Sequence, residues 1–190
     1  MSNQLRIIGG EFKRRQLDFA SIDGLRPTPD RLRETLFNWL MWDIQGAKVL
    51  DLCAGSGALS FEALSRGAAH VTMIEPEQKQ VKYLQKNLQL LGTKQATILT
   101  TTAQRAIPQL NEQFDIIFLD PPYTLNLWQE LAIQLQPLVH AETIIYVEAN
   151  TTLQALNLPQ NWQLIKQSKV GIIKAGLFQV QAQNNTASYE

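Results

Sequence analysis

The sequence predicts an α/β protein built on a doubly wound, mostly parallel sheet, and three observations support this. From residue 47 onward, short apolar runs alternate with helix-forming segments. The first run leads through a glycine-rich turn, residues 49–59 (VLDLCAGSGAL), directly into a helical segment. The last two apolar runs are separated by little more than Gly171. A parallel crossover needs about a dozen residues, so these runs must form an antiparallel hairpin.

The length and composition indicate one globular domain. The chain has 190 residues, of which 45% are hydrophobic and 18% charged. We expect a single domain over 1–190, with a hairpin-and-helix extension at 1–45, a Rossmann-like core at 46–182 and a polar, frayed tail at 183–190. The formal net charge is zero, but residues 1–33 carry seven basic and four acidic side chains, an excess of +3.

Cysteine usage and hydropathy indicate the compartment. Cys53 is the single cysteine, which excludes an internal disulfide and fits a reducing environment. Its place beside the glycine-rich turn favours a small core residue over a nucleophile. No apolar run approaches the roughly 20 residues of a membrane span, and no signal-peptide pattern is present, so we expect a cytoplasmic protein.

The first 45 residues predict a hairpin and a helix. Residues 4–8 and 11–19, separated by Gly9 and Gly10, form the hairpin. Its second arm carries three consecutive basic residues, which either contact nucleic acid or protect an exposed sheet edge: Lys13, Arg14 and Arg15. Thr28 is expected to cap the following helix, with Pro29 at its first position. The buried stripe of this helix comprises Leu32, Leu36, Trp39 and Leu40.

The remaining elements follow in regular alternation. Strands are expected at 47–53, 70–75, 95–100, 114–119 and 143–148, and helices at 58–66, 77–91, 103–110 and 126–136. Gly67 and Gly92 end the first two of these helices. The run at 114–119 is strongly apolar, which is typical of a strand buried on both faces of a parallel sheet. The final hairpin comprises 162–170 and 172–181.

The glycine-rich turn is the first candidate site. Gly55 and Gly57 permit positive φ and the close approach of a ligand. The third glycine of a dinucleotide fingerprint is replaced by Ser60, so that fingerprint is incomplete. Asp51 would repel a pyrophosphate but suits a ligand with positive charge, such as the amino and sulfonium groups of S-adenosylmethionine. An ordinary strand-to-helix turn is the alternative reading.

Further cofactor contacts are expected at the ends of the next two strands. Glu75 lies about 20 residues past the glycines, where an acid can bind ribose hydroxyls. The alternative is a terminal glutamate that faces solvent. Thr102 and Ala103 lie where a backbone group could contact an adenine. The complete expected cofactor set is Asp51, Ala54, Gly55, Ser56, Gly57, Ala58, Glu75, Pro76, Thr102, Ala103 and Asp120.

The second candidate site is Asp120-Pro121-Pro122-Tyr123, directly after the buried strand. The two prolines fix φ and present rigid carbonyls. A carboxylate and a proline carbonyl can accept the two N–H bonds of an exocyclic amine and hold it for methylation. Tyr123 can stack on a base removed from its surroundings. A proline-rich strand end with a capping aspartate is the structural alternative. These four residues are the predicted catalytic set.

With this motif the chain resembles the class I S-adenosylmethionine-dependent methyltransferases that act on amino groups, which carry Asp/Asn-Pro-Pro-aromatic. The segments at 6–10, 25–28, 31–40, 51–59, 62–66, 120–123 and 146–148 narrow the resemblance to the bacterial small-subunit (16S) ribosomal RNA guanine-N2 methyltransferases of the RsmD type. It covers nearly the whole chain, and the arginine-rich segment at 31–40 is its most specific part. Thr102 departs from the Asn or Asp that is more usual before Ala103, so only a backbone contact to adenine is expected there.

The resemblance implies a seven-stranded sheet and methylation of one guanine in small-subunit ribosomal RNA, within an assembling 30S particle. No metal is expected, because direct methyl transfer needs none and the sequence has no Cys/His ligand cluster. No membrane partner is expected. The predicted RNA contacts are Lys13, Arg14, Arg15, Arg26, Arg31 and Arg33. The last three are expected near the mouth of the pocket, where they would contact either RNA phosphates or the carboxylate of the cofactor.

Three rival functions stay open. A DNA or RNA adenine 6-amino methyltransferase could use the same motif, although a DNA enzyme would ordinarily need an added recognition domain. A nicotinamide oxidoreductase is disfavoured by Ser60 and Asp51. A non-catalytic ribosome-assembly factor on the same scaffold is disfavoured by the intact set at 120–123.

Overall fold

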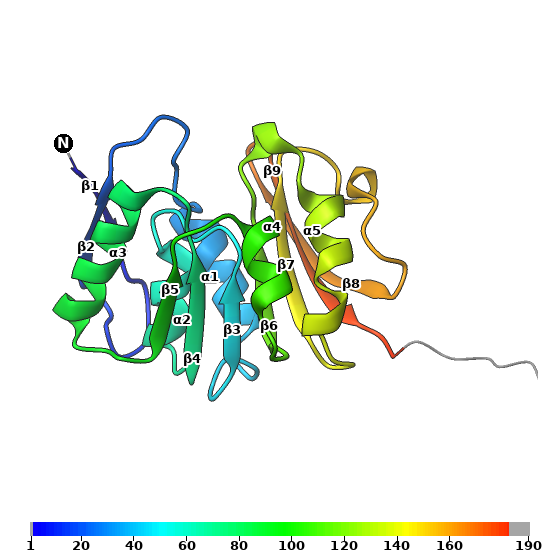
Figure 1. Cartoon of the computed structure of the whole chain (residues 1–190), viewed down its shortest axis with the longest axis horizontal. Coiled ribbons are helices and arrows are strands. Elements are labelled where there is room, and N and C mark those ends of the chain that lie inside the picture. Colours follow the sequence, from blue (N-terminus) through cyan, green and yellow to red (C-terminus); the bar gives the residue numbers. More distant parts are fainter. Residues whose placement is uncertain (1, 183–190) are drawn as a thin grey trace, which may run out of the picture.

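The computed structural model describes residues 2–182, so the predicted polar tail at 183–190 lies outside the described residues. Seven strands form one sheet in the order β5-β4-β3-β6-β7-β9-β8, and β1 and β2 form a separate two-stranded sheet (Figure 1). The strands are β1 (Ser2–Arg6), β2 (Gln16–Ala20), β3 (Lys48–Asp51), β4 (His70–Ile74), β5 (Ala96–Leu99), β6 (Ile116–Leu119), β7 (Ile144–Ala149), β8 (Trp162–Val170) and β9 (Ile173–Val180). The predicted fold class is confirmed.

Five α-helices and four 3-10 turns connect the strands. The helices are α1 (Asp30–Trp39), α2 (Ala58–Ser65), α3 (Gln78–Leu91), α4 (Ala103–Ala106) and α5 (Trp128–Gln134). The 3-10 turns are η1 (Ile107–Gln109), η2 (Tyr123–Leu125), η3 (Gln136–Leu138) and η4 (Leu153–Leu156). Gly92 ends α3 in the left-handed conformation, as its position predicted. In the part of the chain that the structure describes, no helix has the length and apolarity needed to cross a membrane.

The central strands of the sheet are buried on both faces. Along β6, Ile116 and Phe118 belong to a core with α1, α2 and the N-terminal hairpin, whereas Ile117 and Leu119 belong to a second core with α4 and α5. This alternation follows from the two-residue period of a strand. It explains why all four residues of β6 are apolar, since neither face of this strand meets water.

The strand order places the crevice of the sheet at β3 and β6. From β3 the chain adds β4 and β5 on one side, and it then returns to add β6 and β7 in parallel on the other. Ligands of open α/β sheets bind outside the carboxyl ends of the strands at such a reversal. The glycine-rich turn after β3 and the loop after β6 therefore lie next to each other at this carboxyl edge.

The N-terminal hairpin exists but differs from its predicted form. Its strands pair from Ser2 with Ala20 to Arg6 with Gln16, and residues 7–15 form a long connection in place of a Gly-Gly turn. The hairpin packs on α3, where Asn87 donates a hydrogen bond to the Asp18 carbonyl over 2.8 Å. The helix start also differs: α1 begins at Asp30 with Pro29 as its N-cap, and the Thr28 hydroxyl does not cap it.

Candidate functional site

The glycine-rich turn adopts the conformation that the sequence predicts. Gly55 and Gly57 have φ of 54° and 81°. A Cβ at Gly57 would collide with the Phe61 ring, and one at Gly55 would lie 2.9 Å from Leu25 Cδ1. Protein side chains thus fill the space beside both glycines. The positive φ angles and the neighbouring side chains are enough to explain why glycine occupies both positions. The expectation that these glycines leave room for a ligand stays a prediction.

Asp51 ends β3 beneath this turn and is 2% exposed. Ser60 Oγ donates a 2.6 Å hydrogen bond to Asp51 Oδ2. Burial raises the pKa of Asp51 to about 6, although the Ser60 bond opposes that rise. The residue in the third glycine slot therefore has a specific task, which is to hold this carboxylate. A buried acid of this kind gains most from a cationic ligand.

Glu75 follows β4 and its carboxylate is attached to the glycine-rich turn. The Gly55 N–H donates to Oε2 and the Glu77 N–H donates to Oε1, each over 2.9 Å. The residue is 8% exposed, so the alternative of a solvent-facing glutamate is wrong. Burial raises the pKa of Glu75, and the two amide bonds oppose the rise. A carboxylate has about four acceptor sites, so two remain for ligand hydroxyls.

The predicted catalytic loop begins directly after β6. Pro121 is buried, Pro122 is exposed, and Asp120 and Tyr123 are partly buried. The Pro122 carbonyl accepts the Leu125 N–H over 3.1 Å, so this carbonyl is used within the loop. Of the two prolines, Pro121 is therefore the candidate for the proline carbonyl in the predicted chemistry. Its rigid attachment to Asp120 fixes the two proposed acceptors relative to each other.

The most important residue that sequence reasoning missed is Glu148, which lies in β7 and is 3% exposed. Tyr123 Oη donates to Glu148 Oε1 over 3.1 Å. Tyr146 Oη and Thr28 Oγ1 both donate to Glu148 Oε2 over 2.9 Å. Its position at the end of a predicted strand was the available signal. Tyr146 belongs to the same strand as Glu148, but Thr28 and Tyr123 come from distant segments, so only the fold reveals the complete cluster.

The ring of Tyr123 is held from a second direction. It stacks on Trp128 with centroids 5.9 Å apart. Trp128 Nε1 in turn donates to the Glu148 backbone carbonyl over 2.9 Å. Tyr123 is thus fixed at its hydroxyl and against one face of its ring, which preorganises the ring for contact with a planar ligand.

Asp120 and Glu148 form a pair of interacting acids. Burial raises the pKa of Asp120 well above its usual range, and the Glu148 charge raises it further. Burial also raises the pKa of Glu148, but the hydroxyl groups of Tyr146, Thr28 and Tyr123 oppose that rise. The hydroxyl donors therefore favour the ionised form of Glu148, and Asp120 is the member that holds a proton more readily.

Two predicted RNA contacts lie near this site. The segment at 21–29 runs over the carboxyl edge from the end of β2 to α1 (Figure 1): Leu25 contacts the Gly55 turn, and Thr28 bonds Glu148. Arg26, in this segment, and Arg31, in the first turn of α1, are both exposed.

Arg33 is not an RNA contact in this structure. Its side chain is 1% exposed, and Nη2 donates to the Arg6 carbonyl and to Asp30 Oδ1, each over 2.8 Å. Glu62 lies 4.0 Å from Nε and also accepts the backbone N–H groups of Ile8 and Gly9. The prediction for Arg33 is wrong, because this guanidinium attaches the N-terminal segment to α1 and α2.

The basic arm lies at the opposite edge of the sheet. The Glu11 N–H donates to the Ser65 carbonyl at the end of α2, and Arg15 donates to the Leu90 carbonyl near the end of α3. Both helices begin at the carboxyl edge, and α3 has 14 residues, a length of about 21 Å. The exposed side chains of Lys13, Arg14 and Arg15 therefore lie far from Asp120, and both predicted roles of this arm, contact with nucleic acid and protection of a sheet edge, stay predictions.

The remaining predicted residues occupy less informative places. Thr102 is exposed at the start of α4, and Ala103 is buried. Ala54, Ser56 and Ala58 are buried within the glycine-rich turn, and Pro76 is exposed after Glu75. Burial raises the pKa of the Cys53 thiol well above its usual range, which fits an inert core cysteine. Among the described residues no group of three His, Cys, Asp or Glu side chains could hold a metal.

Comparisons with known proteins identify the family of this chain. A family model described as conserved hypothetical protein 95 matches residues 5–179. The chain is 40% identical over 187 residues to ribosomal RNA small subunit methyltransferase D of Escherichia coli strain K12, covering 97% of this chain and 94% of that protein. For the Haemophilus influenzae protein of the same name the identity is 42% over 183 residues, covering 93% and 94%. A solved structure, putative methyltransferase yhhF from Escherichia coli, superimposes with a TM-score of 0.86 at 40% identity, covering 95% of this chain and all of that one.

Proposed function

The chain belongs to the family of ribosomal RNA small subunit methyltransferase D, and on this premise we propose that it methylates the 2-amino group of a guanine in small-subunit ribosomal RNA. It is an S-adenosylmethionine-dependent methyltransferase. The observation that carries the proposal is the placement of the Asp120 loop beside the glycine-rich turn, at the reversal of strand order.

The donor groups around the turn fit S-adenosylmethionine. Glu75 presents a carboxylate that two backbone amides orient, and its free acceptor sites suit the two ribose hydroxyls. Asp51 presents a buried carboxylate that suits the ammonium group, because pairing with a cation offsets its desolvation. When bound, this cofactor supplies the methyl group from its sulfonium. A pyrophosphate ligand would meet two acids here, which disfavours the nicotinamide alternative.

The loop after β6 holds the acceptor base. Asp120 and the Pro121 carbonyl accept the two N–H bonds of the exocyclic amine, so its nitrogen is aimed for transfer. Tyr123 stacks on the base, and its ring needs little reordering because Glu148 and Trp128 already fix it. The acids around this loop, Asp51, Glu75 and Glu148, are buried, which strengthens the electrostatic contacts that they make.

We further infer that the N-terminal extension and the core act as one domain, since Leu5, Leu17 and Phe19 of the hairpin share a core with β3 and β6. The substrate is a partly assembled 30S particle in the cytoplasm, where the target guanine is still accessible. The first inference predicts a single unfolding transition. The second predicts faster methylation of particles than of protein-free RNA.

One experiment tests the proposal. Tritiated S-adenosylmethionine is supplied with protein-free small-subunit RNA, 30S particles from cells that lack this enzyme, or duplex DNA, and the labelled nucleoside is identified by mass spectrometry. We expect N2-methylguanosine in RNA. N6-methyladenosine would instead establish the adenine alternative, and binding to particles without any transfer would establish the assembly-factor alternative.

A further inference from the structure

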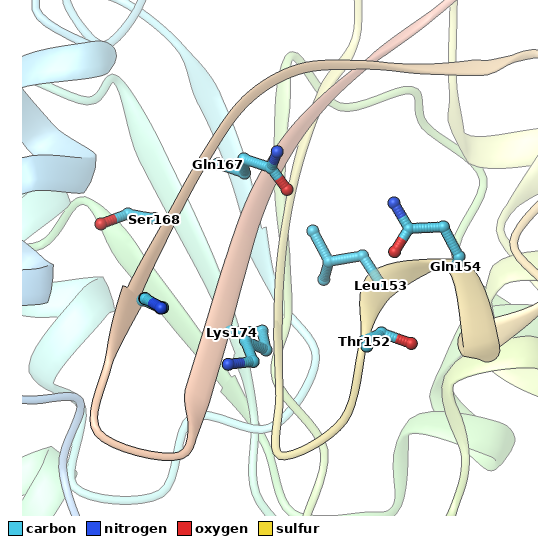
Figure 2. Close-up of a pocket in the computed structure, with 7 residues that line it drawn as sticks. Thr152, Leu153, Gln154, Gln167, Ser168 and Lys174 are labelled. Atoms are coloured by element: carbon cyan, nitrogen blue, oxygen red, sulfur yellow. The ribbon is translucent and has the colours of Figure 1, made fainter.

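A groove opens beside the hairpin of β8 and β9, separate from the crevice described above (Figure 2). It has a volume of about 390 Å³ and lies between η4 and the hairpin. Its polar lining includes two lysines and two amides, Lys169, Lys174, Gln154 and Gln167. In Figure 2, Gln154 and Leu153 project from η4 toward the hairpin strands that carry Gln167 and Lys174.

The register of the sheet places this groove at the same edge as the catalytic loop. Leu119 pairs with Val147, so Asp120 is level with Glu148 in the neighbouring strand. Lys174 pairs with Ala149, the residue after Glu148. Only β7 separates β6 from β9, which corresponds to two strand spacings, or about 10 Å. A chain molecule that reaches Asp120 can therefore continue into the groove.

The charge of this region is one-sided. Residues 149–182 contain three lysines and no aspartate, glutamate or arginine, although the whole chain has zero net charge. These lysines are Lys166, Lys169 and Lys174, and none forms an ion pair with the residues that the structure describes. The amide and hydroxyl groups of the lining add neutral donors. A surface that carries lysines and neutral hydrogen-bond donors, and no acidic side chain, is suited to binding phosphate oxygens.

We propose that this groove binds the sugar-phosphate backbone of the substrate RNA beside the target nucleotide. This inference rests on the proposed function, because it assumes that the substrate is RNA. It replaces the basic arm as the main electrostatic contact, since Lys13 and Arg14 lie at the opposite edge of the sheet. The groove is also three strand spacings from β3, about 14 Å, which separates it from the cofactor side of the crevice.

The test compares two variants with the same loss of charge. One is Lys169→Gln/Lys174→Gln in the groove, and the matched control is Lys13→Gln/Arg14→Gln in the arm. Binding of a fluorescein-labelled transcript of small-subunit RNA is measured over a range of salt concentrations. The logarithm of the binding constant falls linearly with the logarithm of the salt concentration, and each lost contact to a single-stranded phosphate makes this slope less steep by about 0.7. For the groove variant, which loses two contacts, we expect a slope about 1.4 less steep than that of the wild type. The arm variant should keep the wild-type slope.

Kinetics supply the second measurement. The groove variant should raise KM for the RNA, while kcat at saturating RNA and the calorimetric affinity for S-adenosylmethionine stay unchanged. A wild-type slope and KM in this variant would overturn the inference and leave the proposed function intact. An effect on 30S particles but not on protein-free RNA would also overturn it, in favour of a protein contact. If the wild type transfers no methyl group, the proposed function fails, and the salt slope still decides the groove.

Discussion

Replacing Asp120 tests whether an acceptor at the end of β6 orients the amine. In Asp120→Ala the loop keeps both prolines and Tyr123, but the side-chain acceptor is gone. Loss of one preorganised electrostatic partner slows a reaction by about 10²–10³, which corresponds to about 2.7–4 kcal/mol of transition-state stabilisation. Cofactor affinity should change little, because Asp51 and Glu75 occupy the other side of the crevice.

The same variant should not destabilise the protein at neutral pH. Burial and the Glu148 charge raise the pKa of Asp120, so the folded state binds its proton more tightly than the unfolded state does. Stability from this group is therefore greatest at low pH and is lost as the pH rises from about 4, the unfolded pKa, through the raised folded value. Without this carboxyl group, the protein no longer loses that stability as the pH rises. The Tm of Asp120→Ala at pH 8 should therefore equal or exceed the Tm of the wild type.

The assay is single-turnover methylation of 30S particles, with Asp120→Asn as the matched control. The amide keeps a carbonyl acceptor, so we expect Asp120→Asn to react within about tenfold of the wild type, a difference below about 1.4 kcal/mol. Near-wild-type transfer by Asp120→Ala would refute the placement of the active site. Equal slowing of both variants would refute the acceptor role and indicate that the carboxylate takes a proton.

Three further predictions concern the surrounding acids. Glu75→Ala should weaken S-adenosylmethionine binding by about 1.5–3 kcal/mol, the range for a hydrogen bond to a charged group, and an unchanged calorimetric Kd would contradict the ribose assignment. Affinity for S-adenosylmethionine should fall as the pH drops below about 6, because Asp51 then becomes protonated and loses its charge. In the same titration, the affinity of Asp51→Asn should not change with pH. Equal pH profiles for the two proteins would rule out Asp51 as the partner of the cation. Tyr123→Phe and Tyr146→Phe each remove one hydrogen bond to Glu148, so each should lower the free energy of unfolding in urea by about 1.5–3 kcal/mol. Only Tyr123→Phe should also slow methyl transfer. Identical kinetics for the two variants would show that the Tyr123 hydroxyl does not position the ring.

The arginines of α1 show where a sequence pattern was insufficient. Arg31 lies outside the apolar stripe and is exposed, as expected. Arg33 also lay outside the predicted stripe, yet it is buried beside Phe37, four residues further along the helix. Residues at i and i+4 share a helix face, so the buried face includes Arg33 and Phe37 beside the predicted leucines, whereas Trp39 of the predicted stripe is only partly buried. The buried partner of Arg33, Glu62, could not be predicted because it comes from another helix.

Local chemistry was sufficient for the parts of this protein that depend on neighbours in the chain. Apolar runs, glycine positions and the spacing of the last two strands determined the doubly wound sheet and its terminal hairpin. The motifs at 51–58 and 120–123 needed no tertiary information, because each combines a strand end with the residues that follow it. Glu75 was also predictable, since parallel strands bring their carboxyl ends to one edge.

Tertiary structure alone decided how distant groups combine. Glu148 collects hydroxyl donors from Thr28, Tyr123 and Tyr146, and the order of β6 and β7 brings these segments together. The basic arm and the lysines of the β8–β9 hairpin were both visible as charges in the sequence. Which of them lies beside Asp120 depends on strand register and on where α2 and α3 end, because charges act through distance in space and not through separation along the chain.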